Sequence, residues 1–76
     1  MELKDFIANF AEQFDETDAS EITAATEFKT LEEWSSLIAL SVIAMVDEEY
    51  DVALKGADVR NSNTVEDLYN IVKSRI

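Results

Sequence analysis

SSLIALSVIAMVDEEY, residues 35–50, is apolar almost throughout until it reaches Asp47. Apolar content alone would also allow a buried strand, but a continuous run of this length exceeds a typical strand. The segment therefore predicts a helix that begins at Ser35 or Ser36 and ends at about Tyr50. A helix that is apolar nearly all round cannot bury its whole surface in so small a domain, so part of that surface is expected to face solvent.

Amphipathic helices are predicted on both sides of this segment. An N-terminal helix over about residues 2–15 is predicted by apolar residues at spacings of three and four, namely Leu3, Phe6, Ile7, Phe10 and Phe14. Near the C-terminus, Asn63-Thr64-Val65-Glu66 predicts an N-cap at Asn63 with a glutamate three residues later. The last helix then follows the stripe Val65, Leu68, Tyr69, Ile71 and Val72.

The remaining segments are expected to be a long loop and one short turn. Residues 18–34 are polar and aperiodic, which is typical of a loop that crosses the molecule. Its apolar residues are expected to pin it to the core: Ile22, Phe28, Leu31 and Trp34. Thr30-Leu31-Glu32-Glu33 fits a capping box that opens a short turn. After Gly56, residues 57–61 are expected to form one short helical turn.

Together these elements predict an all-α fold in a single domain, residues 1–76. The expected architecture is a small four-helix bundle of three longer helices and one short helix, with the long loop between the first two. One glycine and no proline also argue against an all-β fold, which needs turn residues often.

The charge of the chain restricts its partners. Six basic residues against 17 acidic ones give a net charge of -11. Nucleic acid and anionic membranes would repel such a surface, and basic patches on other proteins are the expected partners. No apolar run approaches a membrane span, and MELKDFIANF lacks the features of a signal peptide, so a cytoplasmic monomer is expected.

Catalytic chemistry is not expected. The chain has no cysteine and no histidine, which removes the common nucleophile, general base and metal ligand. The carboxylate pairs Glu32-Glu33 and Glu48-Glu49 are interpreted as solvated acidic faces. Asp47, Glu48 and Asp51 offer the alternative of a calcium site but lack the pattern of a calcium loop, so no metal is predicted.

The serine pair at the start of the predicted central helix is the most distinctive feature. Serine is a preferred N-cap, and two in succession allow one to cap while the other points outward. A helix N-terminus offers free N–H groups and the positive end of the dipole, so a phosphate esterified to such a serine would be well placed.

Taken as a whole, the chain resembles the acyl carrier protein family over roughly residues 3–75. Ser35-Ser36-Leu37 stands where that family has Asp-Ser-Leu, so Ser36 matches the attachment serine and Ser35 departs from the aspartate. Val46-Asp47-Glu48-Glu49-Tyr50 resembles the acidic end of the family's second helix, and residues 63–68 resemble the opening of its last helix.

This resemblance implies a carrier rather than an enzyme. A phosphopantetheinyl transferase would attach 4'-phosphopantetheine covalently to Ser36, and the arm would hold acyl groups as thioesters for enzymes of fatty acid, polyketide or related lipid biosynthesis. The partner-binding surface would comprise Leu37, Ile38, Leu40, Asp47 and Glu48. The space for a sheltered acyl chain would be lined by Val42, Val46, Leu54, Val59 and Leu68, for which core packing is the compatible alternative.

Two other functions stay open at this point. One is an acidic protein-interaction domain that carries no cofactor and needs no hydroxyl at Ser36. The other is an aminoacyl or peptidyl carrier, which the sequence does not separate from an acyl carrier. Ser35 is the alternative attachment residue.

Overall fold

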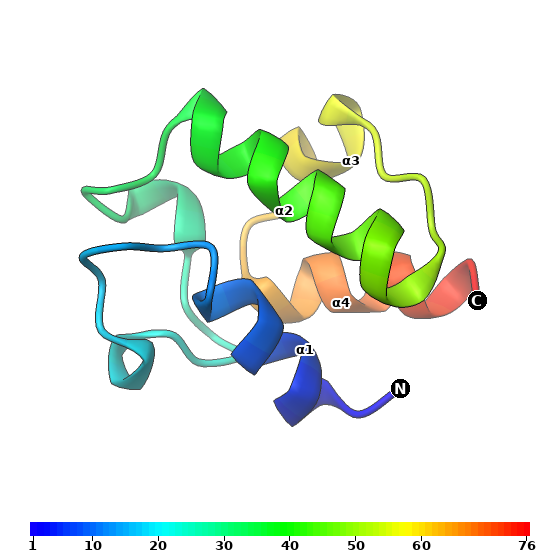
Figure 1. Ribbon diagram of the computed structural model, residues 1–76, viewed down its shortest axis with the longest axis horizontal. Coiled ribbons are helices and arrows are strands. Elements are labelled where there is room, and N and C mark those ends of the chain that lie inside the picture. Colours follow the sequence, from blue (N-terminus) through cyan, green and yellow to red (C-terminus); the bar gives the residue numbers. More distant parts are fainter.

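A computed structural model describes residues 1–76 and contains four α-helices and no strand (Figure 1). The helices are α1 (Leu3–Ala11), α2 (Ser36–Tyr50), α3 (Gly56–Arg60) and α4 (Val65–Ser74). Short 3₁₀ turns at Ala19–Glu21 and Phe28–Thr30 interrupt the long segment between α1 and α2. α1 packs against α2 and α4, and α3 packs against α4. The predicted all-α bundle is confirmed at this level, including the bounds of α2 and the short third helix.

Aromatic rings connect α1 to the rest of the core. The ring centroid of Phe10 in α1 lies 5.4 Å from that of Phe28 in the long loop. Phe28 in turn meets Trp34 at 4.9 Å, and Phe6 meets Tyr69 of α4 at 5.7 Å. Phe6, Phe10 and Phe28 are fully buried. The prediction that apolar residues pin residues 18–34 to the core is therefore confirmed.

The prediction that the first helix extends to residue 15 is wrong at its C-terminal end. After Ala11 the chain makes tighter bonds, from Gln13 N to the Phe10 carbonyl and from Phe14 N to the Ala11 carbonyl, each 3.1 Å. This turn brings Phe14 into the core, where its ring lies 5.6 Å from Phe10. The apolar spacing thus predicted the burial of Phe14 correctly, but a turn rather than the helix provides it.

The N-cap of α4 lies one residue later than predicted. Thr64, not Asn63, is the cap, and its hydroxyl accepts a hydrogen bond of 3.1 Å from Asp67 N. The carboxylate of Asp67 accepts reciprocal bonds from Thr64 N and Asn63 N, in the place expected for Glu66. These backbone bonds lower the pKa of Asp67.

The long loop completes the N-terminus of α4. Val65 N donates to the Thr26 carbonyl at 3.1 Å, and Glu66 N donates to the Ala24 carbonyl at 3.0 Å. These bonds satisfy N–H groups that a helix cannot satisfy itself. The segment between α1 and α2 is therefore a structural part of the bundle as well as a connection.

Glu33 holds the two ends of the long loop together, and the capping box predicted at Thr30–Glu33 is absent. The Glu33 carboxylate accepts bonds of 2.7 to 3.0 Å from the N–H groups of Asp15, Glu16 and Thr17, and one of 2.8 Å from the Thr17 hydroxyl. The hydroxyl of Thr30 donates instead to the Glu27 carbonyl. Desolvation raises the pKa of Glu33, but the hydrogen bonds from Thr17 and from the three backbone groups together lower it. The interpretation of Glu32-Glu33 as a solvated acidic face is therefore wrong for Glu33.

Candidate functional site

Ser35 and Ser36 divide two roles at the start of α2. Ser35 is the N-cap, and its hydroxyl accepts a hydrogen bond of 3.3 Å from Ile38 N. Ser36 is the first helical residue; its side chain is exposed, and its hydroxyl makes no hydrogen bond within the chain. The expectation that one serine caps and the other faces outward is confirmed.

A groove runs beside Ser36 between α2 and α3. Its volume is about 510 Å³. Ser36 contributes to the lining, together with the apolar side chains Trp34, Leu40, Ile43 and Val59 and the basic side chains Lys29 and Arg60. The exposed hydroxyl is therefore next to a surface that combines apolar and positively charged side chains.

The apolar residues predicted for partner binding are not equally available. Leu37 is 73% exposed and Leu40 is 62% exposed, which are high values for leucine. Ile38 is half-buried and packs against the core. The expected exposed apolar face of α2 is thus formed mainly by Leu37 and Leu40.

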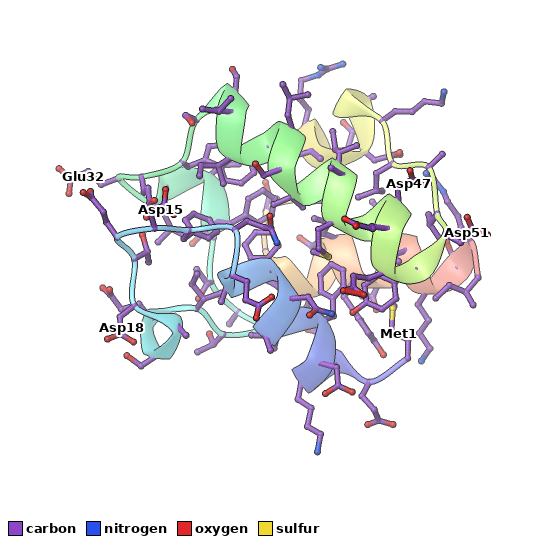
Figure 2. The ribbon with its side chains drawn as sticks, in the orientation of Figure 1. Met1, Asp15, Asp18, Glu32, Asp47 and Asp51 are labelled. Atoms are coloured by element: carbon purple, nitrogen blue, oxygen red, sulfur yellow. The ribbon has the colours of Figure 1, made fainter.

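The acidic end of α2 is exposed and is unfavourable for the helix. Asp47, Glu48 and Glu49 lie in the last turn, where the helix dipole is negative, and no basic residue lies in that turn. Asp51 follows as the C-cap in the left-handed conformation, with φ of 55°. Figure 2 shows Asp47 and Asp51 together at this end, whereas Asp15, Asp18 and Glu32 lie along the loop on the other side.

The five residues considered as the lining of an acyl space are all buried in the core: Val42, Val46, Leu54, Val59 and Leu68. Their burial shows that they pack in the core, which is the alternative role given to them in the sequence analysis. Val59 also contributes to the groove beside Ser36.

Two further depressions on the surface are acidic. One is lined by Glu16, Glu21, Glu32 and Glu33 with Thr17 and Leu31. The other lies between α1 and α2 and is lined in part by Glu12, Glu48 and Glu49. No group of three acidic side chains has the arrangement needed to hold a metal ion, and this includes the calcium alternative at Asp47, Glu48 and Asp51.

Sequence reasoning did not identify Lys29, Arg60 and Asp58 as parts of this region. Lys29 Nζ donates to the Arg60 carbonyl at 2.7 Å and so ties the long loop to the end of α3. Asp58 of α3 forms the only salt bridge of the chain, two bonds of 2.8 Å from the Arg75 guanidinium. The Arg75 hydrogen bonds, the bond from Lys55 N and the nearby positive charge lower the pKa of Asp58 to about 2. Lys29 and Arg60 could have been singled out in the sequence because only six residues of this acidic chain are basic.

Comparisons of the chain with protein-family models, with curated proteins and with solved structures found no match. None of the helices has the length and apolar content needed to cross a membrane.

Proposed function

We propose that the chain is an acyl carrier that holds acyl intermediates as thioesters on a 4'-phosphopantetheine arm attached to Ser36. The observation that carries this proposal is the Ser36 hydroxyl, which is exposed, free of internal hydrogen bonds and located in the first turn of the longest helix. The small helical bundle and the resemblance of residues 3–75 to acyl carrier proteins agree with it. The arm would supply the thiol that the chain lacks.

The surroundings of Ser36 fit a phosphodiester. A phosphopantetheinyl transferase would join Ser36 Oγ to the phosphorus of coenzyme A that bears the pantetheine, and adenosine 3',5'-bisphosphate would leave. The chain would then hold a negative charge at the N-terminus of α2, where the helix dipole favours it. Lys29 and Arg60 add positive charge in the adjacent groove.

Ser35 would support this site as the N-cap of α2. Its side chain caps α2 and is already used by the bond from Ile38 N. Ser36 therefore has the freer hydroxyl of the pair. The aspartate that acyl carrier proteins have at this place is also a good capping residue, so the replacement by Ser35 preserves the local helix start.

The partner surface would follow α2 from its apolar start to its acidic end. Leu37 and Leu40 expose apolar surface that the fold does not use. Asp47 and Glu48 place negative charge where it disfavours the helix, so their position agrees better with binding than with stability. Enzymes of fatty acid, polyketide or related lipid biosynthesis with basic and apolar docking patches would fit this surface.

The experiment is the intact mass of the chain after incubation with coenzyme A and a broad-specificity phosphopantetheinyl transferase. The parent chain should gain one phosphopantetheine, and Ser36→Ala should gain none. Ser35→Asp is the matched control, because it removes the neighbouring hydroxyl but keeps a capping side chain. It should be modified like the parent.

Two results would contradict the proposal. Modification of Ser36→Ala would move the attachment residue elsewhere. No modification of the parent by several transferases would favour the acidic interaction domain without a cofactor.

A further inference from the structure

The Glu33 carboxylate joins the two ends of the long loop just before α2 begins. Its Oε1 accepts bonds of 2.8 to 3.0 Å from Glu16 N, Thr17 N and the Thr17 hydroxyl, and its Oε2 accepts one of 2.7 Å from Asp15 N. Figure 2 shows Asp15 and Glu32 close together at this contact. Hydrogen bonds to an ionised acceptor are strong, so the contact fixes one segment against the other.

Electrostatics alone would disfavour a carboxylate at this place. Glu33 lines one depression together with Glu16, Glu21 and Glu32, and no basic side chain lines it. Like charges that share a depression repel each other. The four donors therefore offset a repulsion that an uncharged residue 33 would avoid, which indicates that this carboxylate has a specific role.

The start of α2 has little support of its own. Ser35 supplies one capping bond, and at 3.3 Å from Ile38 N this bond is longer than usual. No acidic residue lies in the first turn of α2, whereas Glu66 and Asp67 lie in that of α4, where Asp67 completes a capping box. Further support for the first turn of α2 has to come from outside the helix.

Trp34 connects the Glu33 contact to the cap. Its N–H donates to the Leu31 carbonyl at 3.0 Å, so Glu33 lies inside a tight turn that ends next to the cap. The centroid of the Trp34 ring lies 6.3 Å from that of Phe14. Residues 14–17 thus contact both residues that precede the cap, and a shift of this segment would move the start of α2.

We infer that Glu33 is a positioning residue for Ser36: by binding residues 15–17 it fixes the first turn of α2 and hence the direction of the Ser36 hydroxyl. An enzyme that acts on Ser36 binds only the fraction of chains in which this turn is formed, so a looser turn lowers its apparent affinity. The effect on a transferase rests on the proposed function, whereas the fixed helix start does not.

The test compares Glu33→Ala with Glu32→Ala. Both remove the same side chain and the same charge, but the exposed Glu32 side chain makes no hydrogen bond. Thr17→Val is a milder variant that removes one donor without changing the charge, and Thr17→Ser keeps that donor. Asn9→Ala removes the bond to Tyr50 at the other end of α2 and so controls for a general loss of stability.

Hydrogen exchange in the unmodified, ¹⁵N-labelled chain, followed by NMR, measures the first turn directly. Ile38 N and Ala39 N donate to the hydroxyl and the carbonyl of Ser35, so their exchange reports how often this turn opens. Glu33→Ala should speed exchange at both amides about 3- to 10-fold, as expected for lost hydrogen bonds to a charged group. The glutamate and asparagine controls should exchange like the parent there, because the local opening breaks neither of their contacts.

The rate of phosphopantetheine transfer, measured by intact mass, shows whether the turn matters for Ser36. Glu33→Ala should raise the KM for the chain about 2- to 5-fold and leave kcat unchanged, because chains with a formed turn react normally. Thr17→Val should raise KM less and Thr17→Ser should not. A change in stability alone would not move KM while the variant stays folded.

Equal exchange at Ile38 and Ala39 in Glu33→Ala and Glu32→Ala would overturn the inference, and so would equal KM values for these two variants. Faster exchange at the same amides in Asn9→Ala would also overturn it, because a general loss of stability would then explain the effect. If no transferase modifies the parent, the proposed function fails, and the exchange rates alone decide whether Glu33 fixes the start of α2.

Discussion

The two ends of α2 are built differently. At the C-terminal end, Met45 and Val46 are buried, and Asn9 Nδ2 of α1 donates to the Tyr50 hydroxyl at 2.8 Å. At the N-terminal end, Ser36 and Leu40 are exposed, and the Ser36 side chain makes no hydrogen bond. The C-terminal end thus has one face that is fixed by packing, beside its exposed acids, whereas the N-terminal end exposes an apolar side chain and a free hydroxyl that the fold does not require. The difference indicates where the surface serves something other than stability.

Two alanine substitutions test this difference most strongly. Met45→Ala should cost about 2–3 kcal/mol, because it leaves a cavity in the core. Leu40→Ala should change the free energy of unfolding by less than about 0.5 kcal/mol, because Leu40 is largely exposed. Urea unfolding followed by circular dichroism measures both. Similar losses for the two variants would mean that the ends of α2 do not differ in packing.

A glycine at the C-cap of α2 should stabilise the chain. Asp51 has φ of 55°, a conformation that favours glycine, and it adds negative charge at the negative end of the dipole. We expect Asp51→Gly to add about 1 kcal/mol to the free energy of unfolding in urea.

Asp15→Gly is the matched control for this substitution. It makes the same chemical change in the long loop, at a residue that does not have a positive φ, so it should not stabilise the chain. A destabilised Asp51→Gly variant would show instead that the Asp51 carboxylate has a structural role.

The attachment of α3 should respond to acid through Asp58, which lies in this helix but does not line the groove. The pKa of Asp58 is about 2 when folded, below its ordinary value near 4, so its contribution is complete above about pH 4. That contribution is lost as the pH falls from about 4 towards 2. After allowance for solvent screening it is on the order of 1 kcal/mol.

Asp58→Asn should therefore be less stable than the parent at pH 7 and should depend less on pH between 4 and 2. Arg75→Gln, which removes the other partner of the salt bridge, should show part of the same change. Urea unfolding at a series of pH values measures both variants. A parent-like pH dependence in Asp58→Asn would argue that the salt bridge does not hold α3.

Salt should give the smallest effect. A net charge of -11 implies repulsion across the folded chain, and the exposed acids at the end of α2 contribute to it. Sodium chloride or millimolar divalent cations should raise the melting temperature by a few degrees through screening. A melting temperature that is independent of both would contradict the importance of this repulsion.

Local patterns predicted much of the fold. The apolar run of residues 35–50 predicted the bounds of α2. The prediction that one serine of the pair caps this helix while the other faces outward was also correct. Phe14 shows a limit of such patterns, because apolar spacing predicts burial but does not distinguish the end of a helix from a turn. The cap of α4 lies one residue later than predicted, because Thr64 with Asp67 offers the same pair of capping hydrogen bonds as Asn63 with Glu66.

Long-range contacts could not be predicted in this way. Glu33 binds residues 15–17, and Lys29 meets Arg60, so each contact depends on how the long loop crosses the bundle. No local pattern in the sequence encodes either contact. The groove beside Ser36 is for this reason a finding of the structure, whereas the exposure of Ser36 at the start of α2 was predicted.

The most direct test of the central claim is the modification state of Ser36 in the chain purified from the cells that produce it. Trypsin should release residues 30–55, which contain Ser35, Ser36 and Ser41, and fragmentation by mass spectrometry distinguishes the three. We predict one phosphopantetheine on Ser36, with or without an acyl group on its thiol. An unmodified peptide, or a modification on Ser35 or Ser41, would contradict this account.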